Sequence, residues 1–434
     1  MIRRSTHATE ERELLTAREA CALLGIKAET LYAYASRGLV SSLPGPPGER
    51  SRRYSKEEIL RLKVRHDARA GHAPVAAAAL SWGEPVLDSA ITEVTPSGPR
   101  YRGRLAIDLA REGVTLERAA ELLWTGALPD DAPPAPPFAL SAPALETTLR
   151  GAPTPLHRLP LFLATLAAHD PARFAARVST AEAALAGELG RARSLLATMP
   201  LVLGRGDAAA NVRVALAIAR GLRLPRPSVA ARAVDRALVL SADHELNVST
   251  FAARVVASSG ADTYACLIAA SCAMTGTGHG GACDRVEALV TEIAAAAKTH
   301  PRTKARAKAN PGASAVRAAL EARAARGEAI PGLGHPLYPA GDPRGAALIA
   351  LARELGPRSA RVRTAIAIAE AGEEIFGLGA TLDLGLVALA DAISAPEGTA
   401  SALFAIGRVA GWIAHILEQR AQGRMVRPRA RYVG

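Results

Sequence analysis

The sequence predicts an all-α protein, and its composition and helix signals carry that prediction. Aromatic residues make up only 4% of the 434 residues and apolar residues 49%, so a large core must be built from Ala, Leu, Val and Ile. A core of this kind favours close-packed helices over sheets, which are rich in aromatic side chains. From Trp82 onward, Ala- and Leu-rich segments of helical length follow one another. With 22% charged residues the composition is globular, which excludes a disordered or collagen-like chain.

The first 75 residues are predicted to form a separate small domain. Residues 1–70 contain 14 basic and 9 acidic residues, which gives +5 of the net charge of +12. Thr16 with Glu19, and Ser55 with Glu58, have the spacing of a capping box, so each pair predicts the start of a helix. Between them we expect two short helices and then a Gly- and Pro-rich hairpin over 43–54.

This pattern, LTAREACALLGIKAETLYAYASRGLV followed by RRYSKEEI, resembles the winged helix-turn-helix of MerR and excisionase proteins. The resemblance implies that the second helix enters the major groove of DNA. It also implies that arginines of the wing contact phosphates: Arg50, Arg52 and Arg53. Ala33 and Ala35 stand in the second helix where a DNA-reading helix usually carries longer polar side chains, so we expect low sequence specificity. The alternative is a basic domain for dimerisation or for binding another partner.

Cysteine and hydropathy patterns predict a soluble, cytoplasmic chain. The four cysteines form no CxxC pair, which argues against a zinc site and against a disulfide framework. Arg, Asp, Pro or His interrupts every apolar run before the roughly 18 residues that a membrane span needs. The N-terminus carries charged residues where a signal peptide would be apolar.

Four short segments interrupt the Ala-rich helices with residues that helix cores disfavour. They are 242–251 with His244, 275–282 with His279, 330–344 with His335, and 381–386 with Asp383. Each alone has an ordinary structural explanation as a cap, a core hydrogen bond or a loop. Together they supply what a carbanion condensation needs. A carboxylate removes a proton next to a thioester, neutral imidazoles stabilise the enol and polarise a second carbonyl, and arginines bind carboxylates.

Five motifs then carry a specific resemblance to the citrate synthase family, over roughly residues 82–434. Four of them are HELNVSTFAARVVASSGADTYACLIAA, GHGGA, PGLGHPLYPAGDPR, and GRVAGWIAHILEQ with RPRARYVG. The fifth lies earlier in the chain, where YRG is followed by LAIDLA and AAELLWTGALP. All five stand in the order in which the family has them.

The resemblance implies a role for each site residue. Asp383 is implied to deprotonate acetyl-CoA, His279 to stabilise the enol oxygen, and His335 to polarise the carbonyl of oxaloacetate. Further residues are implied to bind oxaloacetate: His244, Arg344, Arg408 and Arg427. The segment implied to contact CoA is Pro331, Gly332, Leu333 and Gly334.

The implied fold has a large helical domain and a smaller one at about 282–386, within a catalytic domain of residues 82–434. The implied reaction is the condensation of acetyl-CoA with oxaloacetate to citrate, without a metal or resident cofactor. The implied assembly is a homodimer, with Arg427 completing the partner's site. Departures from the family pattern at Thr277, Cys283, Pro339 and Leu384 leave the acyl-CoA preference open. Two alternatives remain: a 2-methylcitrate synthase using propionyl-CoA, and a DNA-binding regulator that senses acyl-CoA or a dicarboxylate.

Overall fold

The chain folds into two compact units, Met1–Asp88 and Ser89–Gly434, which we call the head and the body. The structure is a computed structural model. It describes the following residues: 14–36, 40–44, 52–56, 58–59, 87–138, 145, 149–152, 154–178, 180–203, 212–299, 311–428 and 432.

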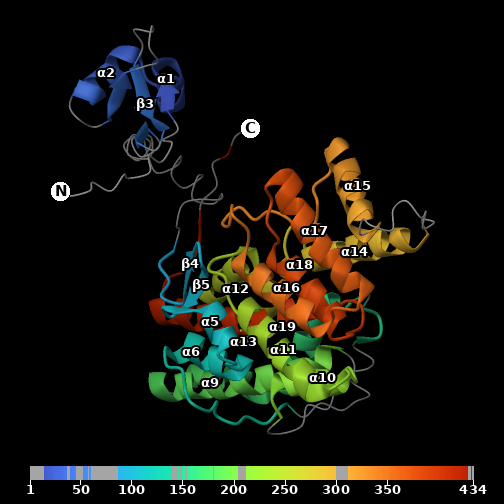
Figure 1. The fold of residues 1–434 in the computed structure, drawn as a ribbon. Coiled ribbons are helices and arrows are strands. Elements are labelled where there is room, and N and C mark those ends of the chain that lie inside the picture. The colour runs from blue at the N-terminus through green and yellow to red at the C-terminus, as the bar shows by residue number, and fades with distance from the viewer. Residues whose placement is uncertain are drawn as a thin grey trace, which may run out of the picture. The chain divides into compact units, whose positions relative to one another are not determined.

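The head combines two short helices with a three-stranded antiparallel sheet (Figure 1). Its elements are β1 (Leu14–Thr16), α1 (Ala17–Leu24), α2 (Ala28–Ser36), β2 (Ser42–Pro44) and β3 (Arg52–Ser55), and the strand order is β1-β3-β2. Its own small core consists of Ala20, Leu24, Leu31, Val40, Tyr54 and Ile59. This is the predicted winged helix-turn-helix, with β2 and β3 as the wing.

One of the two predicted capping boxes forms completely. The Thr16 hydroxyl accepts from the Glu19 backbone N–H, and the Glu19 carboxylate accepts from the Thr16 backbone N–H. At the second box, Ser55 accepts from the Glu58 N–H at 3.5 Å, but the Glu58 carboxylate accepts from the backbone and hydroxyl of Ser41. Of the two hydrogen bonds predicted for the second box, the one accepted by Ser55 forms. The one predicted for the Glu58 carboxylate does not, because this carboxylate binds Ser41 in the loop before β2. The rest of the predicted helix to about Arg69 lies outside the described residues.

The body is built mainly from helices, as predicted. It opens with β4 (Thr92–Thr95), β5 (Gly98–Tyr101) and β6 (Arg104–Leu105). The first helical segments are α5 (Ala106–Arg111), α6 (Leu116–Thr125), α8 (Pro155–His169), α9 (Ala181–Thr198), α10 (Val214–Gly221) and α11 (Pro227–Ser241), with 3₁₀ segments at Pro171–Val178 and Met199–Leu203. Then follow α12 (Val248–Ser258), α13 (Thr263–Met274), α14 (Ala282–Thr299), α15 (Pro311–Ala325), α16 (Pro343–Leu355), α17 (Ala360–Phe376), α18 (Leu382–Ala392) and α19 (Thr399–Gln422).

The expectation of helices directly from Trp82 missed the small antiparallel sheet β4-β5-β6. Its turns lie at Gly98 and Gly103, whose φ angles of 113° and 85° are left-handed values that glycine adopts most readily. Tyr101 on β5 is fully buried, and its hydroxyl donates to the Val239 carbonyl at 2.9 Å. The sheet therefore anchors the start of the body to the end of α11.

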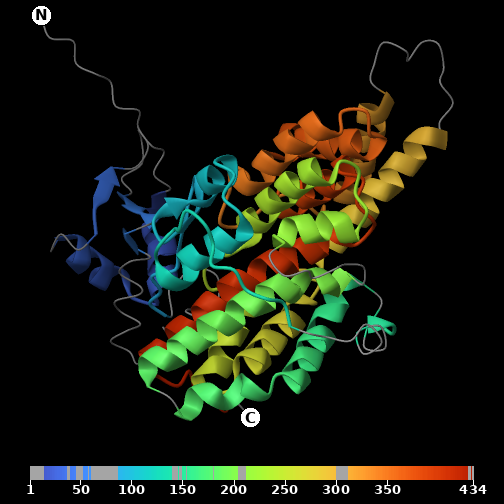
Figure 2. The same cartoon turned by 90° about the horizontal axis from the view of Figure 1, so that it is seen from below.

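Helix α19 forms the centre of the body (Figure 2). It packs against α6, α11, α12, α13 and α18, and nearly all of its residues are buried. Its mean hydropathy over an 18-residue window is 1.5 with few charges, so by length and composition it passes the test for a membrane span. The sequence predicted no membrane span, because Arg, Asp, Pro or His interrupts each apolar run. However, 94% of that window is buried inside the body, as expected for a core helix.

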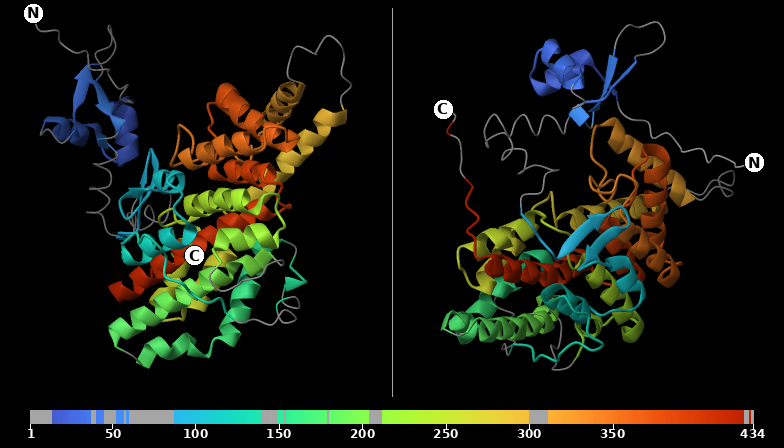
Figure 3. Two further views of the ribbon diagram at one scale, coloured as in Figure 1. Left: turned by 60° about the horizontal axis from the view of Figure 1, so that its bottom comes forward. Right: turned by 90° about the vertical axis from the view of Figure 1, so that its left-hand side faces the viewer.

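Helices α14–α18 pack on one another and lie together on one side of the body (Figure 3). This grouping includes the region predicted as a smaller subdomain at about 282–386. Contacts join residues 89–434 into one unit, and the boundary of the subdomain stays a prediction.

Candidate active site

The predicted site residues come from separate segments that meet at helix ends. His244 lies between α11 and α12, His279 between α13 and α14, and His335 between α15 and α16. Arg344 and Asp383 lie in the first turns of α16 and α18, and Arg408 lies inside α19.

His244 and His335 face each other, with ring centroids 5.6 Å apart in an edge-to-face arrangement. Tyr338 completes the cluster, because its hydroxyl lies 2.9 Å from His244 Nε2 and its ring centroid 5.1 Å from that of His335. The guanidinium of Arg344 lies over the Tyr338 ring, 5.6 Å from its centroid. The structure thus brings three of the predicted oxaloacetate-binding residues together around one tyrosine.

The His335 loop is fixed to the segment just before Asp383. The Gly334 N–H donates to the Gly379 carbonyl at 2.8 Å, and the Thr381 N–H donates to the Gly332 carbonyl at 2.9 Å. Within the loop, the Leu337 N–H donates to His335 Nδ1 at 3.1 Å. A ring nitrogen that accepts a hydrogen bond carries no proton, so the proton of the neutral imidazole lies on Nε2. His335 can therefore donate to a carbonyl oxygen through Nε2.

His279 is held by a serine. Its Nε2 lies 2.8 Å from Ser249 Oγ, a hydroxyl that accepts from Trp412 Nε1 at 3.1 Å and also lies within hydrogen-bond distance of Asn247 Oδ1. The hydroxyl has one proton for these two acceptors, and when it donates to Nε2 the proton of the neutral ring lies on Nδ1, which can then donate to a ligand. The His279 ring also meets Phe404 of α19 edge-on.

Asp383 is a carboxylate in an apolar setting that is held on both oxygens. The Cys283 thiol donates to Oδ1 and the Thr381 hydroxyl to Oδ2, both at 3.2 Å. Burial raises the pKa of Asp383, and the two hydrogen bonds oppose that rise only in part. A carboxylate with a raised pKa is a stronger base than an ordinary aspartate.

Arg344 is a buried cation with one donor left over. Its side chain makes a two-pronged ion pair with Asp342, from Nε to Oδ1 at 3.0 Å and from Nη2 to Oδ2 at 2.7 Å. The third nitrogen, Nη1, is buried without a hydrogen-bond partner among the described residues. A buried donor without a partner costs free energy, so this nitrogen fits a position where a ligand oxygen binds.

Arg408 is 1% exposed and stands in an otherwise apolar stretch of α19. Its Nε donates to the Ser241 carbonyl at 2.8 Å, and its guanidinium lies over the Phe404 ring. Burial lowers the pKa of Arg408 to about 10, and the charge of Arg344 contributes to that change. Two buried cations near each other favour a bound dianion.

The three histidines are neutral near pH 7. Burial lowers the pKa of His279 to about 4, with a further contribution from the charge of Arg408. Burial, together with the charge of Arg344, also lowers the pKa of His244 and of His335. Neutral imidazoles can donate a hydrogen bond without adding charge to the site.

Arg427 and the segment predicted to contact CoA lie apart from the cluster around Tyr338 or have side chains that face the core. Arg427 is exposed beyond the end of α19, and no contact joins it to the other site residues within the described part of the chain. Of the segment predicted to contact CoA (Pro331, Gly332, Leu333, Gly334), the Leu333 side chain is buried against Gly372. The Leu333 side chain is part of the hydrophobic core, so a ligand would contact this segment mainly through its backbone.

In the head, Arg52 is exposed on β3 and donates to the Ser42 hydroxyl, and Arg53 is half-buried beside it. Arg50 lies outside the described residues. On α2, Ala33 and Ala35 are half-buried, and the exposed positions belong to Glu29, Tyr32 and Ser36. The exposed face of α2 therefore consists of residues other than Ala33 and Ala35, and the low sequence specificity stays a prediction.

Sequence reasoning assigned no role to Tyr338, Ser249 or Trp412, although all three lie inside the motifs that it quoted. Cys283 was expected to be either a buried filler or a reactive thiol. It is fully buried, and burial together with the adjacent Asp383 raises the pKa of its thiol well above the usual range. The thiol is therefore neutral, and it acts as a hydrogen-bond donor.

Comparison with known proteins gives two family matches. Residues 79–429 match the family described as citrate synthase, C-terminal domain, and residues 14–64 match a helix-turn-helix domain. Among curated relatives, a putative citrate synthase 2 from Mycobacterium tuberculosis is 37% identical over 209 residues, 46% of this chain and 51% of the relative. A 2-methylcitrate synthase from Shewanella oneidensis is 30% identical over 206 residues, 47% of this chain and 50% of the relative. The matched part thus spans about half the length of these relatives.

A solved structure shares the fold. It is a ternary complex of carboxymethyl coenzyme A and oxaloacetate with citrate synthase from Thermoplasma acidophilum. Its TM-score is 0.66 at 21% identity, and the match covers 82% of this chain and 96% of that one. The predicted two-part architecture, a helical body of this fold with a helix-turn-helix head, is confirmed.

Proposed function

Because the chain belongs to the citrate synthase family, we propose that it condenses acetyl-CoA with oxaloacetate to give citrate and free CoA. The observation that carries the proposal is the Nη1 of Arg344, which is buried near the neutral histidines and has no hydrogen-bond partner among the described residues. A small dicarboxylate satisfies this donor and the charge of Arg408 together.

The residues divide into two halves that match the two substrates. Asp383 takes a proton from the methyl group of acetyl-CoA, and its raised pKa suits that task. His279 stabilises the enol oxygen, while His335 donates from Nε2 to the carbonyl of oxaloacetate, where the new C–C bond forms. Water then cleaves the C–S bond and releases the thiol. Acid–base groups and positioned donors suffice for these steps, so the proposal includes no metal or resident cofactor.

The proposal and its nearest alternative differ in the acyl-CoA that the enzyme prefers. A 2-methylcitrate synthase would use propionyl-CoA, and the match to the Shewanella enzyme keeps this alternative open. Thiol release measured with acetyl-CoA and with propionyl-CoA, each with oxaloacetate, decides between them. Release with neither thioester would contradict both and favour a regulator that only senses these ligands.

The pH dependence of turnover tests the role of Asp383. The base works only when ionised, so turnover should fall as pH drops through its pKa, which burial holds above the ordinary value of 3.8. Cys283→Ala removes a hydrogen bond that lowers this pKa, so the acid limb should move to higher pH. Cys266→Ala, at a buried cysteine whose sulfur contacts the Ala261 carbonyl, is the matched control. An acid limb that is identical in the Cys283 variant and the wild type would contradict the assignment of Asp383 as the base.

For assembly and location, we propose a cytoplasmic homodimer in which Arg427 completes the partner subunit's site. The exposed position of Arg427 beyond α19 leaves it accessible to a second copy. Sedimentation of the purified protein, with and without oxaloacetate, checks the oligomeric state.

For the head, we propose binding to duplex DNA, on the strength of its fold and its match to a helix-turn-helix domain. The exposed face of α2, with Glu29, Tyr32 and Ser36, is the part that would meet the major groove. The exposed fraction of Tyr32 is 53%, which is large for an aromatic side chain and agrees with a contact surface. The partner-binding alternative predicts no affinity for DNA.

Affinity of the full chain for a random duplex should fall steeply with salt, because phosphate contacts release counterions. Changing Arg52 and Arg53 together to Ala should weaken binding and flatten the salt slope by about two units. Arg104 and Arg111 are exposed arginines of the body, and their joint change to Ala removes the same charge as a control. Fluorescence anisotropy at several salt concentrations measures all three proteins. Equal slopes for both double variants would contradict a role for the wing.

A further inference from the structure

The turn that carries His244 contains a strained residue. Glu245 has a φ of 54°, a left-handed value that non-glycine residues rarely adopt. Its N–H donates to Asp243 Oδ2 at 3.2 Å, and its carbonyl accepts from the Asn247 N–H at 3.0 Å. A conformation of this kind persists only where the surroundings hold it. The Asp243 carboxylate is the side chain that does so here.

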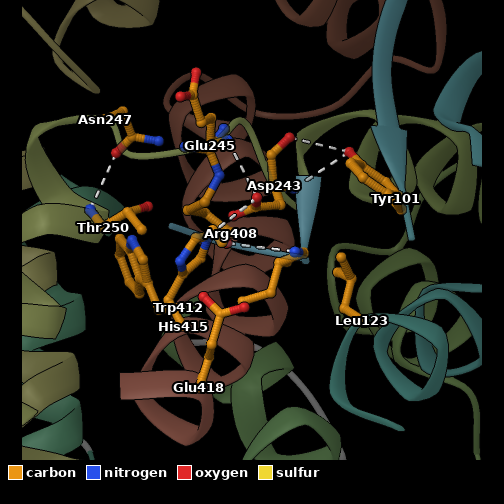
Figure 4. A network of polar contacts seen from close by, with 12 residues as sticks. Tyr101, Leu123, Asp243, Glu245, Asn247, Thr250, Arg408, Trp412, His415 and Glu418 are labelled. Carbon is orange, nitrogen blue, oxygen red and sulfur yellow. Dashed lines mark hydrogen bonds and ion pairs between the residues drawn. The ribbon is translucent and has the colours of Figure 1, made fainter. Parts of the chain in front are cut away.

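Helix α19 approaches this turn unusually closely (Figure 4). A Cβ atom on Gly411 would lie 2.3 Å from Asp243 Oδ1 and 2.4 Å from the Ala242 carbonyl oxygen, so only glycine fits. The Gly411 N–H donates to the Ala242 carbonyl at 3.0 Å, and Arg408 donates to the Ser241 carbonyl. One turn further along α19, His415 Nε2 lies 3.3 Å from Asp243 Oδ2.

His415 is oriented from its other side by an arginine. Both side chains are fully buried, and Arg254 Nη1 lies 3.1 Å from His415 Nδ1. A guanidinium has donors only, so Nδ1 accepts, and the proton of the neutral ring lies on Nε2, facing Asp243. Arg254 itself is fixed by three further acceptors on α19: Glu418, Gln419 and Gln422. The hydrogen bonds therefore run in one direction, from Arg254 through His415 to Asp243.

We propose that His415 is a positioning residue for the active site. Its Nε2–H holds the Asp243 carboxylate, and this carboxylate holds the left-handed turn at Glu245 that sets the His244 ring against His335 and Tyr338. Burial alone would raise the pKa of Asp243, and the hydrogen bond from His415 and the charge of Arg408 both act to lower it. The inference rests on the proposed function, since it assigns His415 to the oxaloacetate half of that reaction.

Two substitutions separate positioning from stability. Asparagine at 415 retains an acceptor near the place of Nδ1 for Arg254 but is too short to reach Asp243. Glutamine reaches the place of Nε2 and can donate to Asp243, but it leaves one proton of Arg254 Nη1 without its acceptor. His415→Asn should therefore raise the KM for oxaloacetate about tenfold, with a loss of melting temperature comparable to that of His415→Gln because each variant leaves one buried group without a partner. His415→Gln should retain the KM but melt at a lower temperature.

The experiment measures thiol release and thermal unfolding of the full chain for both variants, with His169→Asn on α8 as a matched control. The KM for acetyl-CoA should stay within about twofold, because the Asp383 half is untouched. Loss of activity in both variants in proportion to their loss of stability would overturn the proposal, as would a wild-type KM for oxaloacetate in His415→Asn. A wild-type protein that releases no thiol contradicts the proposed function instead. Oxaloacetate binding by calorimetry then still tests whether His415→Asn weakens the site.

Discussion

Replacing Asp383 with Ala should lower the rate of thiol release by about 10²- to 10⁴-fold, the usual effect of losing a general base. Oxaloacetate should still bind, because the groups around His244 and Arg344 lie on other segments. The expected change is therefore in kcat, with the dissociation constant of oxaloacetate within a few-fold of wild type. Stopped-flow thiol release and calorimetry with oxaloacetate measure the two quantities separately.

Asp391→Ala provides the control for this variant. Asp391 lies at the other end of α18 and pairs with Arg361 at 2.6 Å, so its loss removes a half-buried carboxylate from the same helix. It should reduce stability and leave turnover near wild type. Retention of wild-type turnover by Asp383→Ala, or an equal loss in both variants, would contradict the assignment of Asp383 as the base.

Replacing Arg344 with Lys should raise the KM for oxaloacetate by about 10- to 100-fold although the charge is retained. The reason lies in how the donors of the guanidinium are used. Nε and Nη2 of Arg344 donate to Asp342, and Nη1 is left for a substrate carboxylate. A single ammonium group cannot bridge Asp342 and the substrate in the same geometry.

Arg353→Lys is the matched substitution on the same helix, at an exposed pair with Glu370. Exposed pairs contribute little, so its KM and its melting temperature should stay near wild type. Steady-state kinetics with oxaloacetate as the varied substrate compare the two variants. An unchanged KM in Arg344→Lys would count against a direct contact between Arg344 and a substrate carboxylate.

The segments of the proposed site could be singled out from the sequence because each carries its own local signal. Histidines among glycines, and a lone carboxylate in an apolar stretch, stand out in a chain rich in Ala and Leu. The helical body and the winged head follow from the same kind of local pattern. The short sheet at 92–105 was missed because its turns lie within a dozen residues of the start of helix α5.

Contacts between distant segments could not be predicted in this way. Cys283 donates to Asp383 across 100 residues, and Arg254 reaches His415 across 161. The residues next to Cys283 and Arg254 in the sequence do not indicate these partners. The partners come together only because distant helices pack against each other in the fold. The same holds for Glu58, whose carboxylate binds Ser41 and leaves its own capping box incomplete.

The central position of α19 has a consequence for how the protein is made. This helix follows every other helix of the body in the chain, yet α6, α11, α12, α13 and α18 all pack against it. During synthesis on the ribosome these helices emerge before α19, so the part of each apolar face that α19 covers stays exposed until then. The head has its own core between Ala20 and Ile59, so it can fold as soon as it emerges. The body instead completes its core only after translation has passed residue 422, so until then its apolar surface is open to aggregation.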